Sequence, residues 1–194
     1  FSTITAILTQ KNFFSPLSTG GTLVIPDLIG YDDQLISKLI AEHQITLLNC
    51  APSAFYPLIG EADNYQRLQS LRHVFLGGEA IDMMKLNHWC QTEHCNAQIV
   101  NTYGPTECSD VVSYFRIDIP EDYRNKAVPI GRPNDNNQLF ILDRTLNIVP
   151  IGIIGEICIT GACVGQGYLN NPLLTDEVFI DAPFSTPENS YDKF

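Results

Sequence analysis

The segment Asn101-Thr-Tyr-Gly-Pro-Thr-Glu107 gathers side chains that together could bind a nucleotide. An asparagine amide can hydrogen-bond the edge of a base, and a tyrosine ring can stack on its face. A threonine hydroxyl can bond a phosphate oxygen, and a glutamate carboxylate can bind Mg²⁺ beside it. Spacing alone also fits an ordinary structural turn, because Gly-Pro pairs are common where a chain bends.

A second group of reactive side chains comprises His88, Cys90, His94 and Cys95, which are all possible zinc ligands. Structural zinc sites usually pair ligands about two to four residues apart in two separated knuckles. His94 and Cys95 are adjacent, so they cannot both reach one ion easily. The polar end of a helix followed by a loop explains this group better. The six cysteines contain no Cys-x-x-Cys pair, and we expect free thiols.

The elements that would position these groups alternate between strand and helix in the first half of the chain. Apolar runs predict strands at 22–26, 45–50, 72–78 and 98–101. Helical spacing or a proline in a first turn predicts helices at 32–43, from about 52, and at 82–89. Such βα units are typical of a parallel sheet flanked by helices, whose ligands bind beyond the carboxyl ends of the strands. Residues 77–79 and 101–103 fall at such ends.

After about residue 113 the pattern changes to short strands joined by turns. Apolar segments at 137–142 and 155–159 are separated by a turn at 143–144 and followed by another at 160–161. This pattern predicts an antiparallel β portion. We therefore expect an α/β fold over residues 1–194 as one domain, with the change from βα units to antiparallel β near 113–130.

The composition fits a compact globular protein, with 44% hydrophobic and 17% charged residues. The net charge of -11 leaves no surplus of positive charge for a nucleic-acid backbone, so no nucleic-acid partner is expected. ATP remains possible, because backbone N–H groups and a bound cation can hold phosphates. No apolar run approaches the roughly 18 residues that span a bilayer, and residues 1–8 lack a basic signal-peptide flank. We expect a cytoplasmic protein with no membrane partner.

Four segments resemble core motifs of nonribosomal peptide synthetase adenylation domains, relatives of the acyl-CoA synthetases and firefly luciferases. Segment 101–107 looks like the family's adenine and magnesium motif. Segment 155–169, followed by Asn171-Pro-Leu-Leu-Thr175, is similar to a Gly-Glu-Leu strand and glycine loop that leads to Gly-Tyr-Leu. Residues 76–80 resemble the strand end that borders the adenine, and 128–133 resemble the segment between these motifs. The resemblance identifies residues 1–194 as part of an adenylation (AMP-binding) domain, within the large N-terminal subdomain of an acyl-adenylate-forming enzyme.

This resemblance implies ATP and Mg²⁺ as cofactors. The residues that would contact ATP lie at the two strand ends and in the turn after them: Gly77, Gly78, Glu79, Asn101, Thr102, Tyr103, Gly104 and Thr106. Asn101 would bond the amino edge of adenine, and Tyr103 would stack on the ring. Thr106 would contact the α-phosphate and Glu107 would ligate Mg²⁺, so this pair would be catalytic.

The implied reaction is attack of a substrate carboxylate on the α-phosphate of ATP, which gives an acyl adenylate and pyrophosphate. Such chemistry rests mainly on positioning and on electrostatic stabilisation. In the family, an amino acid or related carboxylic acid then passes to a phosphopantetheine thiol on a carrier domain. The implied partners are the carrier and condensation domains of the same synthetase. Two alternatives stay open, a free-standing acyl- or aryl-CoA ligase and a non-catalytic adenylation-domain remnant.

Several parts of the family's site would lie outside this chain. A phosphate-binding loop should precede residue 1, a ribose-binding Thr-Gly-Asp should begin just past Phe194, and the hinge and the lid with its lysine are absent. We therefore expect the chain alone to be inactive, since groups that hold the substrates in the transition state are missing.

The resemblance also implies substrate-pocket positions, which are Asn49, Phe75, Gly77, Thr102, Asp110 and Val111. Phe75 would narrow the pocket, Gly77 would leave depth, and Asp110 would be its charged wall. An ionised Asp110 would favour a polar or cationic substrate side chain. An aspartate that points to solvent is the alternative.

The N-terminal segment departs from the family pattern. Counting back without a gap from Pro16-Leu17 places Ala6-Ile7 where the family has a Phe-Asp pair that binds the substrate's α-amino group. An unpaired buried ammonium is costly, so this register favours an α-hydroxy or α-keto acid, whereas inserted residues after Phe1 would restore the amino-acid reading. Gln166 stands where the family usually has Arg and Cys163 where Gly is common, and both bear on the geometry of that loop.

Overall fold

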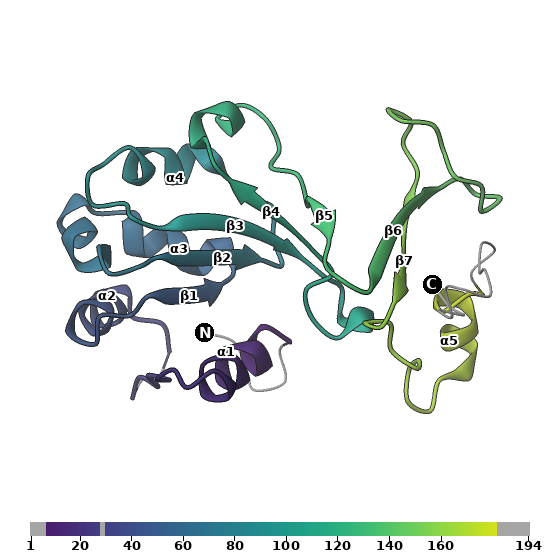
Figure 1. Ribbon diagram of the computed structural model, residues 1–194, viewed down its shortest axis with the longest axis horizontal. Helices are drawn as coiled ribbons and strands as arrows, with labels where there is room; N and C mark the ends of the chain where they lie inside the picture. Colours follow the sequence, from purple (N-terminus) through teal and green to yellow (C-terminus); the bar gives the residue numbers. More distant parts are fainter. Residues whose placement is uncertain (1–6, 28–29, 182–194) are drawn as a thin grey trace. The chain divides into compact units, whose positions relative to one another are not determined.

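The structure is a computed structural model that describes residues 7–27 and 30–181 (Figure 1). The chain folds as two compact units. The first comprises Phe1–Tyr103 and Tyr114–Gly131, and the second comprises Gly104–Ser113 and Arg132–Phe194. The chain passes from the first unit to the second at the peptide bond between Tyr103 and Gly104, within the predicted nucleotide motif.

The first unit is built on parallel strands. Strands β1 (Leu47–Cys50), β2 (His73–Gly77) and β3 (Gln98–Tyr103) pair side by side and run in the same direction. The sheet continues with β4 (Ser113–Ile117), in the order β1-β2-β3-β4, and the two-residue strand β5 (Arg132–Pro133) belongs to the second unit. The predicted parallel sheet is therefore confirmed, and Figure 1 shows the helices that flank it.

The helices of the first unit begin at, or one residue after, the positions that the sequence predicted. Asp32 caps α2 (Asp33–Glu42) by accepting a hydrogen bond from the N–H of Leu35 at 3.0 Å. Asp82 caps α4 (Met83–Cys90) in the same way, and Pro52 opens the short helix α3 (Pro52–Phe55). Three single-turn or two-turn 3₁₀ helices complete this unit: η1 (Tyr56–Ile59), η2 (Ala62–Leu68) and η4 (Pro120–Tyr123).

The core of the first unit lies between one face of the sheet and these helices. Val74 and Leu76 of β2 are fully buried, and Trp89 of α4 packs edge-on against Phe55 with ring centroids 5.3 Å apart. Side chains alternate along a strand, so Phe75 and Gly77 of β2 point to the opposite face of the sheet from Val74 and Leu76. That opposite face carries four predicted pocket positions, Asn49, Phe75, Gly77 and Thr102, in strand register.

The second unit contains an antiparallel hairpin, as predicted. Strand β6 (Asn137–Leu142) pairs with β7 (Glu156–Gly161), and helix α5 (Pro172–Val178) follows. The turn after β6 is held by the Asp143 carboxylate, which accepts hydrogen bonds from the N–H groups of Thr145 (2.8 Å) and Asn147 (3.0 Å). A short 3₁₀ helix, η3 (Thr106–Cys108), carries part of the predicted nucleotide motif.

The strand predicted at 22–26 is wrong. Residues 21–27 are irregular and join no strand of the described chain, and the Ile25 side chain is 67% exposed. β-Branched residues favour strands only where a pleated, half-buried surface accepts them, and this segment has none. Helix α1 (Ile7–Ser18) was not predicted from the sequence, and it contains Pro16 in its last turn.

Two further observations concern the class of protein. No helix within 7–27 or 30–181 is long and apolar enough to cross a membrane. All six cysteines are free thiols, as the absence of Cys-x-x-Cys spacing predicted.

Candidate nucleotide site

Two neighbouring strand ends carry the first group of predicted nucleotide residues. The register of β2 and β3 pairs Leu76 with Asn101 and Gly77 with Thr102. Because the strands are parallel, their carboxyl ends meet at one edge of the sheet, where ligands of open α/β sheets bind. The structure therefore brings residues 77–79 and 101–103 together at this edge.

The glycines that end β2 are required for two different reasons. A side chain on Gly77 would overlap the Thr102 hydroxyl, which donates a hydrogen bond to the carbonyl oxygen of Leu76 at 3.2 Å. The sequence predicted that Gly77 leaves depth in the substrate pocket. In the structure, the Thr102 side chain occupies the space directly beside Gly77. Gly78 has a φ of +85°, a conformation that other residues rarely adopt, and turns the chain toward Glu79.

Glu79 is held by a residue that sequence reasoning missed. The backbone N–H and the hydroxyl of Ser53 donate to the two carboxylate oxygens of Glu79, at 3.1 and 2.8 Å. Ser53 lies in the first turn of α3, where backbone N–H groups lack intrahelical partners. Glu79 therefore ties the end of β2 to the start of α3. The Pro52-Ser53 helix start was the signal for such a capping partner.

Asn101 is buried and fixed in orientation. Its amide nitrogen donates to the carbonyl oxygen of Pro129 at 2.8 Å, and its side chain is 6% exposed. Pro129 belongs to segment 128–133, which the sequence singled out separately. Tyr103, at the end of the same strand, is half-buried. The strand thus presents a preset amide and an aromatic ring, both suited to a base.

The opposite face of the sheet gains a residue from helix α1. Asn49 donates through its side-chain nitrogen to the Asn12 amide oxygen at 2.7 Å, and Asn12 donates back to the backbone oxygen of Asn49 at 3.1 Å. Phe75, the register partner of Asn49, stacks with His73 at a centroid distance of 6.1 Å. Asn12 had no local signal in the sequence, because its partner is 37 residues away.

The N-terminal departure falls at the limit of the described chain. Ala6 lies outside the described residues, and Ile7 begins α1. Phe1 and Phe194, with the segment that leads into Phe194, also lie outside them. The predicted register at Ala6-Ile7 therefore stays a prediction.

In the second unit, residues 104–111 form a tight loop. A side chain on Gly104 would overlap the carbonyl oxygen of Asp110, so only glycine permits this close approach. The loop contains η3, which Thr106 opens as an exposed residue. Ser109 follows with a φ of +66°, and the Asp110 N–H donates to the Cys108 carbonyl oxygen at 2.7 Å. Asp110 itself is half-buried.

Glu107 carries the carboxylate on which the predicted cation site depends. The Tyr168 hydroxyl donates a hydrogen bond to its Oε1, and this bond, with the backbone N–H of Glu107 itself, holds the pKa of the carboxyl below its usual range. The group is therefore ionised at neutral pH. Its second oxygen, Oε2, suits a hard cation such as Mg²⁺, which prefers carboxylate oxygens. The residues present thus fit the predicted ion.

The loop after β7 is tied to the same turn. The Gly165 N–H donates to the carbonyl oxygen of Glu107 at 2.8 Å, and the Ser109 hydroxyl donates to that of Cys163 at 3.2 Å. Val111, the last predicted pocket position, accepts a hydrogen bond through its backbone oxygen from the Asn134 side chain at 2.7 Å. The loop that contains Cys163 and Gln166 therefore keeps a defined geometry with these residues.

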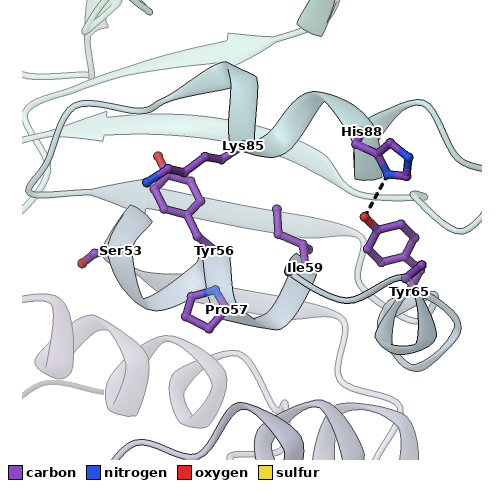
Figure 2. A pocket seen from close by; sticks show the side chains of 9 residues that line it. Ser53, Tyr56, Pro57, Ile59, Tyr65, Lys85 and His88 are labelled. Atoms are coloured by element: carbon purple, nitrogen blue, oxygen red, sulfur yellow. Dashed lines mark hydrogen bonds between the residues drawn. The ribbon is translucent and has the colours of Figure 1, made fainter.

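A separate open groove of about 750 Å³ lies between α4 and the η1 and η2 turns (Figure 2). Lys85 lies over the Tyr56 ring at 4.8 Å, and the Tyr65 hydroxyl bonds His88 Nδ1 at 3.0 Å. Of the residues that line this groove, Ser53 hydrogen-bonds the predicted site residue Glu79. His88 is thus engaged away from the other residues of the zinc pattern, and no three His, Cys, Asp or Glu residues in the described chain are grouped to hold a metal ion.

Comparison with known proteins finds a family match over most of the chain. The family model described as "AMP-binding enzyme" matches residues 2–169. The chain belongs to this AMP-binding enzyme family. Among relatives, tyrocidine synthase 3 of Brevibacillus parabrevis is 38% identical over 181 residues, which cover 93% of this chain and 3% of that protein.

Solved structures of low sequence identity share the fold of the AMP-binding chain. The nonribosomal peptide synthetase FmoA3 in an AMPPNP-bound form has a TM-score of 0.87 at 24% identity, covering 100% of this chain and 20% of that one. PA1221, a protein containing adenylation and PCP domains, has a TM-score of 0.86 at 23% identity, covering 100% and 38%. The AMP-binding chain thus spans a small part of the length of each. Its predicted fold class is confirmed.

Proposed function

We propose that this chain supplies the adenine, α-phosphate and Mg²⁺ contacts of an adenylation domain that activates an amino acid or related carboxylic acid in nonribosomal peptide synthesis. The observation that carries the proposal is the segment Asn101–Glu107, set at the end of β3 in a chain of the AMP-binding enzyme family. Its buried amide, its half-buried ring and its ionised carboxylate have the chemistry that a base, a stacking face and a cation require.

Different residues of this segment would contact different parts of the nucleotide. Asn101 and Tyr103 would hold the adenine with residues 77–79, and Thr106 would meet the α-phosphate. Glu107 would bind Mg²⁺, which supplies neutralisation of charge on the phosphate oxygens when bound. The substrate carboxylate would then displace pyrophosphate from the α-phosphate, in a step that depends on positioning more than on proton transfer.

The family resemblance assigns substrate contacts to Asn49 and Phe75 on the open face of the parallel sheet, and to Asp110 and Val111 in the loop of the second unit. Asn12 is a further candidate, because it fixes the Asn49 side chain. We propose that Asp110 selects for a polar or cationic substrate. Transfer to a phosphopantetheine thiol on a carrier domain is supported by the relatives, which are synthetases or contain adenylation and PCP domains.

The experiment is ATP–pyrophosphate exchange with the complete protein that contains this chain. Glu107→Gln keeps the shape of the side chain but removes its charge, and we expect exchange to fall by about 100-fold because the cation loses a ligand. Glu93→Gln, at an exposed position after α4, is the matched control and should retain native exchange. Equal exchange by both variants would contradict the cation role of Glu107, and a lack of exchange in the native protein would favour a non-catalytic remnant.

A further inference from the structure

The Tyr168 hydroxyl reaches the one carboxylate to which the proposed function assigns a cation. We propose that Tyr168 is a positioning residue, which holds the Glu107 carboxylate in the orientation that binds a divalent cation beside a nucleotide. The inference rests on the proposed function for the role of Glu107. The inference gives a role to the segment around Tyr168, which makes none of the proposed nucleotide contacts.

The geometry separates the two oxygens of the carboxylate. Tyr168 donates to Oε1, so this hydrogen bond restricts rotation of the carboxylate about its last bond and leaves Oε2 outside the bond to the phenol. Metal-binding carboxylates are commonly oriented by such a donor in the surrounding protein. A phenol suits this role because it donates one proton and adds no charge.

Tyr168 is itself held on both sides. Its backbone N–H donates to the Thr175 hydroxyl at 2.9 Å, and its ring packs edge-on against Phe179 with centroids 5.5 Å apart and planes at 77°. Phe179 is 6% exposed, so the ring contact is a buried one. Both partners come from α5 or the residue that ends it, which makes this helix the support for the phenol.

Helix α5 is placed to give that support. Its N-cap Asn171 accepts from the Leu174 N–H at 3.3 Å, and the Thr175 hydroxyl donates to the Asn171 carbonyl oxygen at 2.9 Å. A side chain on Gly167 would overlap Thr175, and its φ of +130° is unfavourable for other residues. Glycine is therefore required for the chain to pass close to Thr175 just before Tyr168.

The backbone of Glu107 is fixed by other bonds. Its carbonyl oxygen accepts the Gly165 N–H at 2.8 Å, and the neighbouring Ser109 hydroxyl bonds Cys163 at 3.2 Å. These contacts hold the turn to the loop whether or not Tyr168 carries a hydroxyl. Loss of the hydroxyl should therefore disturb the carboxylate more than the fold around it.

The test measures cation binding directly, with Mn²⁺ as the probe. The free-ion electron paramagnetic resonance signal of Mn²⁺ is titrated with the complete protein and α,β-methylene ATP. Tyr168→Phe keeps the ring against Phe179 and removes only the hydroxyl. We expect its dissociation constant for Mn²⁺ to rise about 10-fold, within the range seen when the support of a metal ligand is removed. Tyr114→Phe, at a half-exposed position of β4, is the control and should bind as the native protein does.

Kinetics and folding add two readouts. In pyrophosphate exchange, Tyr168→Phe should need about 10-fold more Mg²⁺ for half-maximal rate and should approach the native rate at saturating Mg²⁺. Its thermal unfolding should resemble that of the native protein. A lower rate at every Mg²⁺ concentration with unchanged Mn²⁺ affinity would overturn the proposal, because a purely structural role has that result.

Glu107→Gln separates this inference from the proposed function. If Glu107→Gln weakens Mn²⁺ binding and Tyr168→Phe does not, Glu107 is a ligand and the positioning role is wrong. If Glu107→Gln leaves Mn²⁺ binding unchanged, the proposed function fails first and the positioning role fails with it. If both variants weaken binding, the double variant should be no worse than Glu107→Gln alone, since the two residues act through one carboxylate.

Discussion

At the scale of single residues, Glu107 and Asp110 stand three positions apart in one loop and have different surroundings. Tyr168 donates to Glu107, which supports a fixed, ionised carboxylate. Asp110 is half-buried next to Ser109, whose positive φ sets the direction in which the chain leaves the turn. We propose that Glu107 binds the cation and that Asp110 faces the substrate.

Substitution of Asp110 tests the second assignment. In pyrophosphate exchange with a panel of acids, Asp110→Ala should reduce the preference for polar or cationic side chains over apolar ones by about 10-fold, because the charged wall is lost. Asp135→Ala, an exposed position in the same unit, is the control and should keep the native order of substrates. An unchanged preference in Asp110→Ala would mean that this carboxylate does not face the substrate.

At the scale of elements, the close pairing of β2 and β3 sets the positions of the residues proposed to bind the nucleotide. Gly77 and Thr102 are register partners, and the Thr102 hydroxyl bonds the backbone of β2 at Leu76. The edge that presents Asn101 and Tyr103 depends on this contact. The caps of α2, α4 and α5 similarly set where each helix begins, independently of the site.

The variant Gly77→Ala tests this dependence. The added methyl group would overlap the Thr102 hydroxyl, so we expect a cost of about 1–3 kcal/mol. Hydrogen exchange at the amides of β2 and β3 should accelerate at least about fivefold as these strands open more easily. Adding Thr102→Ala should recover part of the loss, since it removes the overlapping atom. Gly60→Ala, where an added methyl group meets only ordinary contacts, should change little.

At the scale of the whole molecule, apolar burial is concentrated in the first unit. Its core cluster includes Leu68, Val74 and Leu86, all fully buried. The second unit buries Leu142 and a few other apolar side chains. It also leaves several isoleucines exposed: Ile148 at 58%, Ile151 at 107%, Ile153 at 58% and Ile154 at 96%. Less burial gives less free energy to oppose local opening.

Hydrogen exchange on this chain produced by itself measures the difference. We expect the central amides of β2 and β3 to exchange at least about 10-fold more slowly than those of β6 and β7. Exchange at α1, which is joined to β1 through Asn12, serves as an internal reference of intermediate burial. If the amides of β6 and β7 were protected from exchange as strongly as those of β2 and β3, apolar burial would not control the local opening of these strands.

Much of the architecture follows from the sequence by itself. Asp32, Asp82 and Pro52 mark helix starts because capping acts over three or four residues, and the alternation of apolar runs with helical spacing predicts the parallel sheet. The antiparallel hairpin of β6 and β7 follows for the same reason. The segment 22–26 misled because its residue types suit a strand only where a partner surface exists.

The tertiary structure decided which of these groups act on one another. Tyr168 lies 61 residues from Glu107, and Asn12 lies 37 residues from Asn49, so no local spacing could pair them. It also decided that the Thr102 hydroxyl, and not open space, lies beside Gly77. Caps and periodicity are local and can be predicted from neighbouring residues, whereas the partner of a side chain depends on how distant segments pack.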